Sequence, residues 1–214
     1  MILLAQALEL LSGISMDVFL EKQVFAPLGM QRTGYNPGLG NPNCAPTENV
    51  EPWRLELRSA RGDRPVTQTP NVDQSLWIQG EVHDPNTFAL GGVAGHAGLF
   101  STVGDVARFL SAMLTSRFVA NPETVTQFTS RQSATSTRGL GWDTKSPEGS
   151  SAGSRFGPRS YGHTGYTGTS VWADPDSGRF AVLLTNRVHP TSENIKIRDV
   201  RPAFHDAVWQ VLGA

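Results

Sequence analysis

The chain has 214 residues, a formal net charge of −1 and 38% hydrophobic residues, with 22 glycines and 14 prolines. This composition is typical of a loop-rich globular domain, and the lack of a basic run removes electrostatic support for binding nucleic acid or a membrane surface. The single cysteine, Cys44, excludes an internal disulfide, and no apolar run reaches the roughly 18 residues of a membrane span.

The first 30 residues carry two helical patterns. Apolar side chains recur at helical spacing over 2–12, which predicts a helix that ends at Gly13. A second, shorter helix is predicted over 16–25, with Ser15 as its N-cap and Pro27 closing it. The chain thus opens on a helix that has no N-cap or lead-in.

The next segments are poor in periodicity. Residues 34–75 are rich in Pro, Asn, Asp and Gly, which predicts a mostly irregular excursion. Glu48, within it, is expected to be a solvated loop acid. Residues 89–100 hold four glycines, a density that lets the backbone turn sharply and approach another group closely.

Two further helices are predicted before the sheet. Thr102 and Asp105 resemble a capping box ahead of an apolar stripe that runs to Met113. Asn121, followed by proline, is a predicted N-cap for a short helix over 121–130.

The last third has the pattern of a sheet followed by a helix. Residues 143–160 read as a loop, and the β-rich runs 160–173 and 179–186 predict two strands joined by a hairpin loop at 174–178. A final helix is predicted over 200–212. We therefore expect one α+β domain over 1–214, helical and irregular over 1–135 and carrying the sheet and last helix over 136–214.

The most informative segment is 161–170, which reads YGHTGYTGTS. A glycine within a strand often marks the close approach of a ligand or of another chain segment. His163, Thr164 and Gly165 in succession can offer a cation, a hydrogen-bond donor and an open backbone edge to an acyl substrate.

This run resembles the Lys-Thr-Gly signature of the penicillin-binding-protein and β-lactamase superfamily, with His in place of Lys. Other blocks of the sequence resemble that superfamily and occur in the expected order: residues 24–30 ahead of 33–34, residues 98–102 with 105–109, and residues 183–187. Together they cover nearly the whole chain. They are most similar to the branch of class C β-lactamases, D-alanyl-D-alanine carboxypeptidases and related esterases.

The resemblance implies a β-lactamase-like fold, an antiparallel sheet flanked by helices, and roles for several residues. His163 would neutralise or hydrogen-bond the carboxylate of a substrate, or tune proton transfer near the nucleophile, and Thr164 would hydrogen-bond the same end of the substrate. The main-chain N–H of Tyr166 after Gly165 would be an oxyanion-hole donor. His96, in a glycine-rich loop, would line the pocket mouth. The substrate would be a small acyl compound, and no metal or organic cofactor would be needed.

The sequence departs from the family at its nucleophile. No Ser is followed three residues later by Lys, and no Tyr has Asn or Asp two residues on. We therefore expect the chain to be the C-terminal fragment of a serine hydrolase, lacking the nucleophile helix and the first strands, and to be inactive alone. An uncovered sheet edge would favour self-association. Relatives are often exported, which would place the parent protein in the periplasm or outside the cell.

Two alternatives remain open from the sequence. The chain could be a non-catalytic remnant that binds a partner or an acylated ligand. It could be a metal-dependent hydrolase that uses His83, Asp84, His96 and His163, although their spacing resembles no metal motif. The run 149–153 fits Gly-x-Ser-x-Gly, but its loop-like neighbours argue against a nucleophile elbow.

Overall fold

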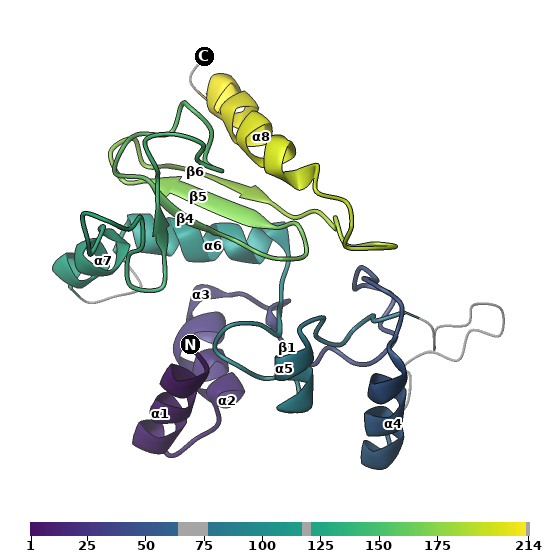
Figure 1. Cartoon of the computed structure of the whole chain (residues 1–214). Coiled ribbons are helices and arrows are strands. Elements are labelled where there is room, and N and C mark those ends of the chain that lie inside the picture. The colour runs from purple at the N-terminus through teal and green to yellow at the C-terminus, as the bar shows by residue number, and fades with distance from the viewer. Residues whose placement is uncertain (64–76, 117–120, 213–214) are drawn as a thin grey trace. The chain divides into compact units, whose positions relative to one another are not determined.

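The computed structural model describes residues 1–63, 77–116 and 121–212. It divides into two compact units (Figure 1). The first comprises Met1–Thr102 and Val188–Glu193, and the second comprises Val103–Arg187 and Asn194–Ala214. Helices combine with antiparallel strands, so the predicted α+β class is confirmed.

The first unit opens with the helices that the apolar spacing predicts. Helix α1 (Ile2–Ser12) ends at Gly13, whose left-handed φ of 72° lets its N–H bond to Glu9 O at 2.9 Å. Helix α2 (Met16–Leu20) continues through a π-helical turn, Glu21–Phe25, into α3 (Ala26–Leu28), so the second helix is longer than predicted. Helix α1 buries none of its residues.

The expectation of an irregular segment over 34–75 is wrong in part, because Pro52–Arg61 forms helix α4. The side chains that α4 buries are Arg54 and Arg58, which are 0% and 5% exposed. Hydrophobic periodicity cannot detect a helix whose inner face is made of arginines. The part 64–75 of the predicted loop lies outside the described residues.

The rest of the first unit is short elements joined by turns. Strand β1 (Gly34–Tyr35) pairs antiparallel with β2 (Leu99–Phe100), and helix α5 (Pro85–Ala89) lies between them in sequence. Gly98, at a φ of 106°, immediately precedes β2. The glycine-rich run before β2 therefore turns sharply, as its composition predicts.

The second unit is a sheet with a helix on each face (Figure 1). The strands follow the order β3 (Asp143–Thr144), β4 (Tyr161–Thr164), β5 (Ser170–Asp174), β6 (Arg179–Leu183), all antiparallel. Helix α6 (Val103–Leu114) covers one face and α8 (Ile197–Leu212) the other. Helix α7 (Pro122–Thr129) begins at the predicted cap, where Asn121 Oδ1 accepts from Glu123 N at 2.8 Å.

Side-chain alternation divides the core of this unit into two layers. Trp172 and Ala181 point toward α8 and pack with Phe156, Phe204 and Trp209. The opposite layer joins α6 to the other sheet face and contains Leu110, Tyr161, Ala173, Phe180, Val182 and Trp142. Gly162 leaves room for the Trp172 ring, since a Cβ there would lie 2.5 Å from it.

Two predictions for this unit need correction. The run 160–173 is two strands, because a tight turn at 165–169 separates β4 from β5. Helix α8 starts at Ile197 instead of residue 200, and its Val200 and Val211 side chains are exposed. The hairpin between β5 and β6 is confirmed, with Asp174 opposite Arg179.

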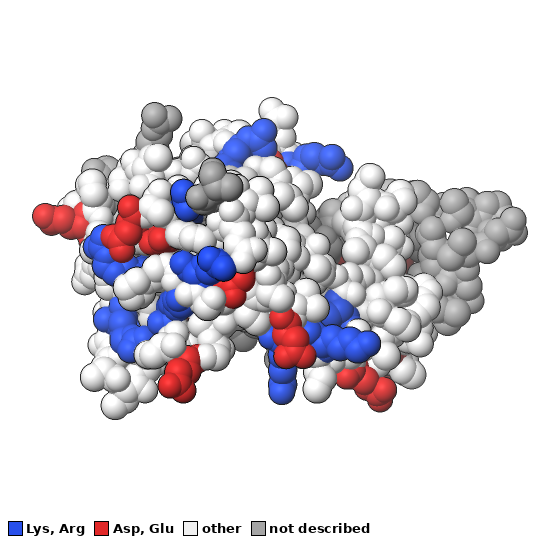
Figure 2. All heavy atoms as spheres, turned by 90° about the horizontal axis from the view of Figure 1, so that it is seen from above, with Lys and Arg blue, Asp and Glu red and all other residues white. Residues whose placement is uncertain are grey.

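Two surface properties bear on function. On the face drawn in Figure 2, Lys and Arg side chains of the described residues lie among Asp and Glu instead of gathering into one basic field. No single described helix is long and apolar enough to span a membrane; Ile2–Ser12 and Met16–Leu28 meet the length and composition test only as a pair bent by 75°.

Candidate active site

Strand β4 places His163 and Thr164 on opposite faces of the sheet. His163 lies opposite Val171, on the α6 face, and its side chain is exposed. Thr164 lies opposite Ser170, on the α8 face, and is half-buried. The two residues of the predicted motif are adjacent in sequence but do not project together.

The turn after β4 is held by an arginine of α8. Arg201 Nη2 donates to two main-chain carbonyls, Gly165 O at 2.6 Å and Thr169 O at 3.0 Å. The turn also closes on itself, because Gly165 N donates to Thr169 O and Gly168 N to Gly165 O. Burial, followed by the nearby charge of Arg187, lowers the pKa of Arg201 below its usual value. One guanidinium thus fixes both ends of the turn.

The middle of the turn is fixed by the residues that follow β6. Arg187 donates through Nε to Tyr166 O at 2.8 Å and through its main-chain N to Thr167 O at 2.9 Å. The Thr185 hydroxyl donates to Gly168 O at 2.6 Å. All five carbonyls of 165–169 therefore accept hydrogen bonds, which leaves this backbone little freedom. A preorganised backbone is what an oxyanion-hole donor requires.

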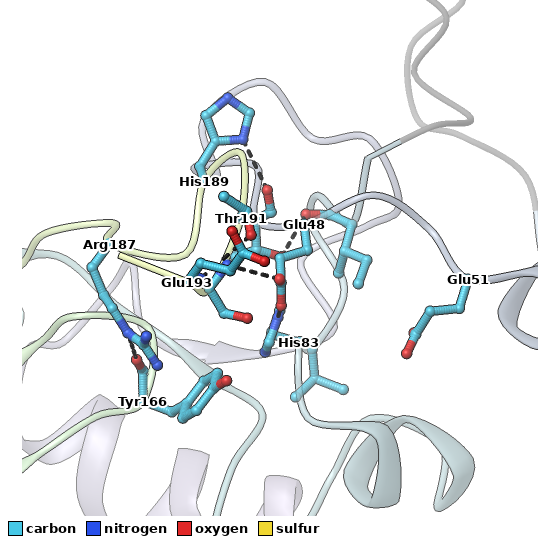
Figure 3. A network of polar contacts seen from close by, with 12 residues as sticks. Glu48, Glu51, His83, Tyr166, Arg187, His189, Thr191 and Glu193 are labelled. Atoms are coloured by element: carbon cyan, nitrogen blue, oxygen red, sulfur yellow. Dashed lines mark hydrogen bonds and ion pairs between the residues drawn. The ribbon is translucent and has the colours of Figure 1, made fainter. Parts of the chain in front are cut away.

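Tyr166 stands at the tip of this turn. Its side chain is 63% exposed, and the Arg187 guanidinium carbon lies 4.3 Å from the centre of its ring. Figure 3 shows the same arginine reaching the Tyr166 carbonyl. Arg187 thus contacts both the ring face and the main-chain carbonyl of Tyr166, and an exposed aromatic ring fixed in this way is suited to contact a ligand.

Ser170, the last hydroxyl of the motif, is sealed in the core. It is 2% exposed, and its Oγ lies 2.9 Å from Nε2 of His205, which is 0% exposed. Burial, followed by the charge of Arg201, lowers the pKa of His205 to about 4. The pair has the composition of a nucleophile and its base, but no substrate can reach it.

The Gly-x-Ser-x-Gly run is structural. Ser151 accepts a hydrogen bond from the indole of Trp172 at 3.2 Å and lies in a turn followed by no helix. The nucleophile elbow needs a strand before the serine and a helix after it. The serine is thus part of the packing beneath α8.

His96, in the first unit, is tied to a helix cap. Its Nε2 lies 3.0 Å from Asp84 Oδ1 and 3.2 Å from Thr87 Oγ1. Asp84 also caps α5 by accepting from Thr87 N at 2.7 Å. Burial disfavours ionisation of Asp84, but the hydrogen bonds from Thr87 and His96 outweigh it and lower its pKa.

Glu48 is not the solvated loop acid that the sequence suggests. Its carboxylate lies 2.8 Å from His83 Nε2, as Figure 3 shows, and accepts a hydrogen bond from the main-chain N of Ser192 at 2.8 Å. Burial disfavours its ionisation, but the hydrogen bonds from Ser192 and His83 prevail and lower its pKa. His189 Nδ1 lies 2.8 Å from Thr47 O. These contacts attach residues 188–193 to the rest of the first unit.

The histidines therefore lie in separate pairs. His83 pairs with Glu48, and His96 pairs with Asp84. Among the described residues, no three His, Cys, Asp or Glu side chains are grouped so that they could hold a metal ion.

Sequence reasoning missed three arginines. Arg187 and Arg201 hold the turn, and Arg138 Nη1 lies 3.4 Å from His163 Nε2. Arg187 falls in a block quoted for the family resemblance, which is a usable signal. Arg138 and Arg201 carry none, because their contacts join residues 25 and 36 positions apart.

The comparisons with known proteins agree with this architecture. The Beta-lactamase family model matches residues 1–203, so the chain belongs to the β-lactamase family, and the predicted resemblance is confirmed. Proteins of Escherichia coli K12 and Salmonella heidelberg, both named "Putative D-alanyl-D-alanine carboxypeptidase", are 35% and 36% identical over 87% and 89% of this chain. The chain spans only 43% and 44% of their lengths.

Solved structures show the same fold. A β-lactamase of Mycobacterium bovis matches this chain over 97% of this chain's length and 60% of its own length, with a TM-score of 0.60 and 22% identity. An octameric penicillin-binding-protein homologue of Pyrococcus abyssi matches 99% of this chain and 41% of its own, with a TM-score of 0.54 and 18% identity. At these identities the likeness concerns the fold alone.

Proposed function

We propose that this chain supplies the substrate-binding strand and oxyanion-hole turn of a serine hydrolase that acts through an acyl-enzyme. The substrate would be an ester, a β-lactam or a D-Ala-D-Ala-type amide. His163, Thr164 and Gly165 would line the site, and the Tyr166 N–H would stabilise the oxyanion. His96 would lie at the pocket mouth.

The observation that carries the proposal is the fixed turn at 165–169. A donor aligned before the reaction stabilises the developing oxyanion without reorganisation, which is worth about 3–4 kcal/mol. Five tied carbonyls hold the Tyr166 amide in one orientation at the end of β4. Membership of the β-lactamase family supports this role for the turn.

The nucleophile would come from polypeptide outside this chain. The sequence contains no Ser-x-x-Lys, and its carboxypeptidase-named relatives are more than twice as long as the part that it matches. Without an activated serine no acyl-enzyme can form. We therefore propose that the chain is a C-terminal fragment of the active protein.

The reading frame upstream of Met1 tests this proposal. We expect an in-frame Ser-x-x-Lys and a Tyr motif there, and we expect the extended protein to be labelled by a fluorescent penicillin or a fluorophosphonate at that serine. The matched control is the extended protein with this Ser replaced by Ala, which should not label. An extended protein that carries the motif and takes up neither probe would contradict the proposal.

The missing motif also favours a second candidate, a protein that binds an acylated ligand or a partner without turnover. A stop codon directly upstream, with no Ser-x-x-Lys before it, would favour this reading. Binding of a D-Ala-D-Ala peptide without release of D-alanine would then be the expected behaviour.

A further inference from the structure

A pocket of about 310 Å³ lies beside helix α7, near one end of the sheet of the second unit (Figure 1). Its described walls come from the end of α6, from α7, from strands β3 and β4, and from the hairpin loop after β5. Tyr161, which lines the pocket, begins β4, whereas the turn at 165–169 follows the last residue of that strand. The pocket is therefore separate from the candidate active site.

Tyr161 brings to this pocket a hydroxyl that has no partner. Its side chain is 1% exposed, and its ring packs edge-on against Trp142, with the ring centres 5.1 Å apart. Its Oη makes no hydrogen bond within the part of the chain that the structure describes. Burial raises the pKa of Tyr161 to about 12, so the hydroxyl keeps its proton at neutral pH and can donate. Since an unpaired buried donor is unfavourable, a ligand that supplies an acceptor would be stabilised here.

The other buried hydroxyls of the described lining already donate within the chain. Thr129 Oγ1 donates to Val125 O at 2.8 Å, and Thr144 Oγ1 donates to Thr137 O at 2.8 Å. A hydroxyl has one proton, so neither threonine can donate to a ligand as well. Among the buried side chains of the described lining, Tyr161 alone keeps an unused donor.

The charge of the lining is positive. Its two described charged residues are Arg131 and Arg159, and no Asp or Glu is among the lining residues that the structure describes. Arg159 is already paired with Asp176. Arg131 is exposed, and its one contact with a described residue runs from Nη2 to the Lys145 carbonyl at 3.3 Å. Its guanidinium is therefore available to an anion.

Much of the remaining lining is apolar. Met113 and Val125 form buried parts of the wall, and Leu114, Pro158 and Pro175 extend it. An apolar cavity of about 150 Å³ can hold benzene. A pocket of roughly twice that volume suits one aromatic ring with substituents.

We propose that this pocket is a second ligand site of the protein, which binds a small aromatic acid. The ring would lie between the apolar walls, the carboxylate would pair with Arg131, and an acceptor atom across the ring would take the hydrogen bond of Tyr161. This site is independent of the proposed acyl chemistry, because none of the residues 163–166 is among its lining.

Two probes of nearly the same shape test the site, para-acetylbenzoate and para-isopropylbenzoate. Both carry the ring and the carboxylate, but only the acetyl group has an oxygen that can accept from Tyr161. Titrations followed by saturation-transfer difference NMR compare their affinities. We expect the wild type to bind the acetyl compound about tenfold more tightly, because the isopropyl compound leaves the buried hydroxyl unpaired. Tyr161→Phe should lose this preference.

Arg131→Gln should weaken the binding of both probes by about fivefold and keep the preference, since it removes the partner of the carboxylate that they share. Arg155→Gln is the matched control, because Arg155 is an exposed arginine of the same unit outside the lining. It should bind like the wild type, and far-ultraviolet circular dichroism checks that each variant is folded.

Three results would overturn the site. One is an acetyl preference that survives in Tyr161→Phe, which would place the bound probe away from this hydroxyl. Another is equal affinity in Arg131→Gln and Arg155→Gln. The third is a wild type that binds neither probe at millimolar concentration. None of these results bears on the acyl-enzyme chemistry, which the labelling of the extended protein tests separately.

Discussion

His205 illustrates at the scale of one residue how burial decides what a side chain can do. It lies on the inner face of α8 and is fully buried, and its Nδ1 has no hydrogen-bond partner among the described residues. Burial, followed by the charge of Arg201, lowers its pKa to about 4, against an opposing effect of Asp206. Because the site is sealed, these properties affect stability and not catalysis.

The stability of the chain should therefore fall in acid. Because the pKa of His205 is lower in the folded state, acid protonates this histidine in the unfolded chain before it does so in the folded one. The free energy of unfolding therefore begins to fall below about pH 6.5, and the loss is complete near pH 4. The shift corresponds to about 3 kcal/mol. Urea denaturation of the wild type and of His205→Gln, at pH 7.5 and 4.5, measures it.

His205→Gln should lose the part of the acid sensitivity that His205 causes, although this variant will be less stable than the wild type at neutral pH. Equal pH dependence in the two proteins would mean that the histidine is not buried as a neutral side chain in solution.

Helix α4 illustrates at the scale of an element how charged residues can form an inner face. Arg54 donates to Glu51 and to the carbonyls of Val82 and His83, and lies over the ring of Phe88 at 4.4 Å. Arg58 and Arg54 share the carboxylate of Glu81.

Glu81→Ala should destabilise the first unit by about 3–5 kcal/mol, because it leaves the buried guanidinium of Arg58 without its anion and removes one of the two carboxylates that Arg54 contacts. Glu56→Ala, which removes an exposed acid of helix α4, should change the free energy of unfolding by less than about 0.5 kcal/mol. Thermal unfolding followed by circular dichroism compares the two. A loss no larger in Glu81→Ala than in Glu56→Ala would contradict the role given to this ion pair.

Local patterns predicted the elements that apolar spacing and capping residues specify. They located α1 with its Gly13 cap, α7 with its Asn121 cap, and the β5–β6 hairpin. They missed α4, whose buried face is charged, and they merged β4 with β5, because the hydroxyl-rich turn has strand-like composition. Arg138 and Arg201 near the candidate site could not be predicted, since their partners are distant in sequence.

At the scale of the whole molecule, two surfaces have no packing or pairing partner within the described residues: one strand edge and one apolar helix face. Strand β6 is the last strand of its sheet. Separately, α1 exposes Leu3, Leu4, Leu10 and Leu11 by 61–88%. An unpaired strand edge offers a row of main-chain donors and acceptors to another chain, and exposed apolar clusters favour association. We propose that both surfaces are covered by other polypeptide in the active protein.

The isolated 214 residues should accordingly self-associate. Sedimentation velocity at micromolar concentration should show oligomers, and a charge on the exposed apolar helix, as in Leu11→Lys, should reduce them. Glu21→Gln, which also raises the net charge by one and alters an exposed residue of the adjoining helical segment, serves as a control for net charge. A monodisperse monomer that unfolds cooperatively would count against this proposal.

The central claim is that this chain carries the binding and oxyanion half of an acyl-transfer site without its nucleophile. Intact-mass spectrometry of the purified chain, after exposure to a fluorophosphonate and to a penicillin, tests that claim most directly. The account predicts an unmodified mass with both reagents. A stoichiometric adduct, mapped to any serine of the 214 residues, would contradict it.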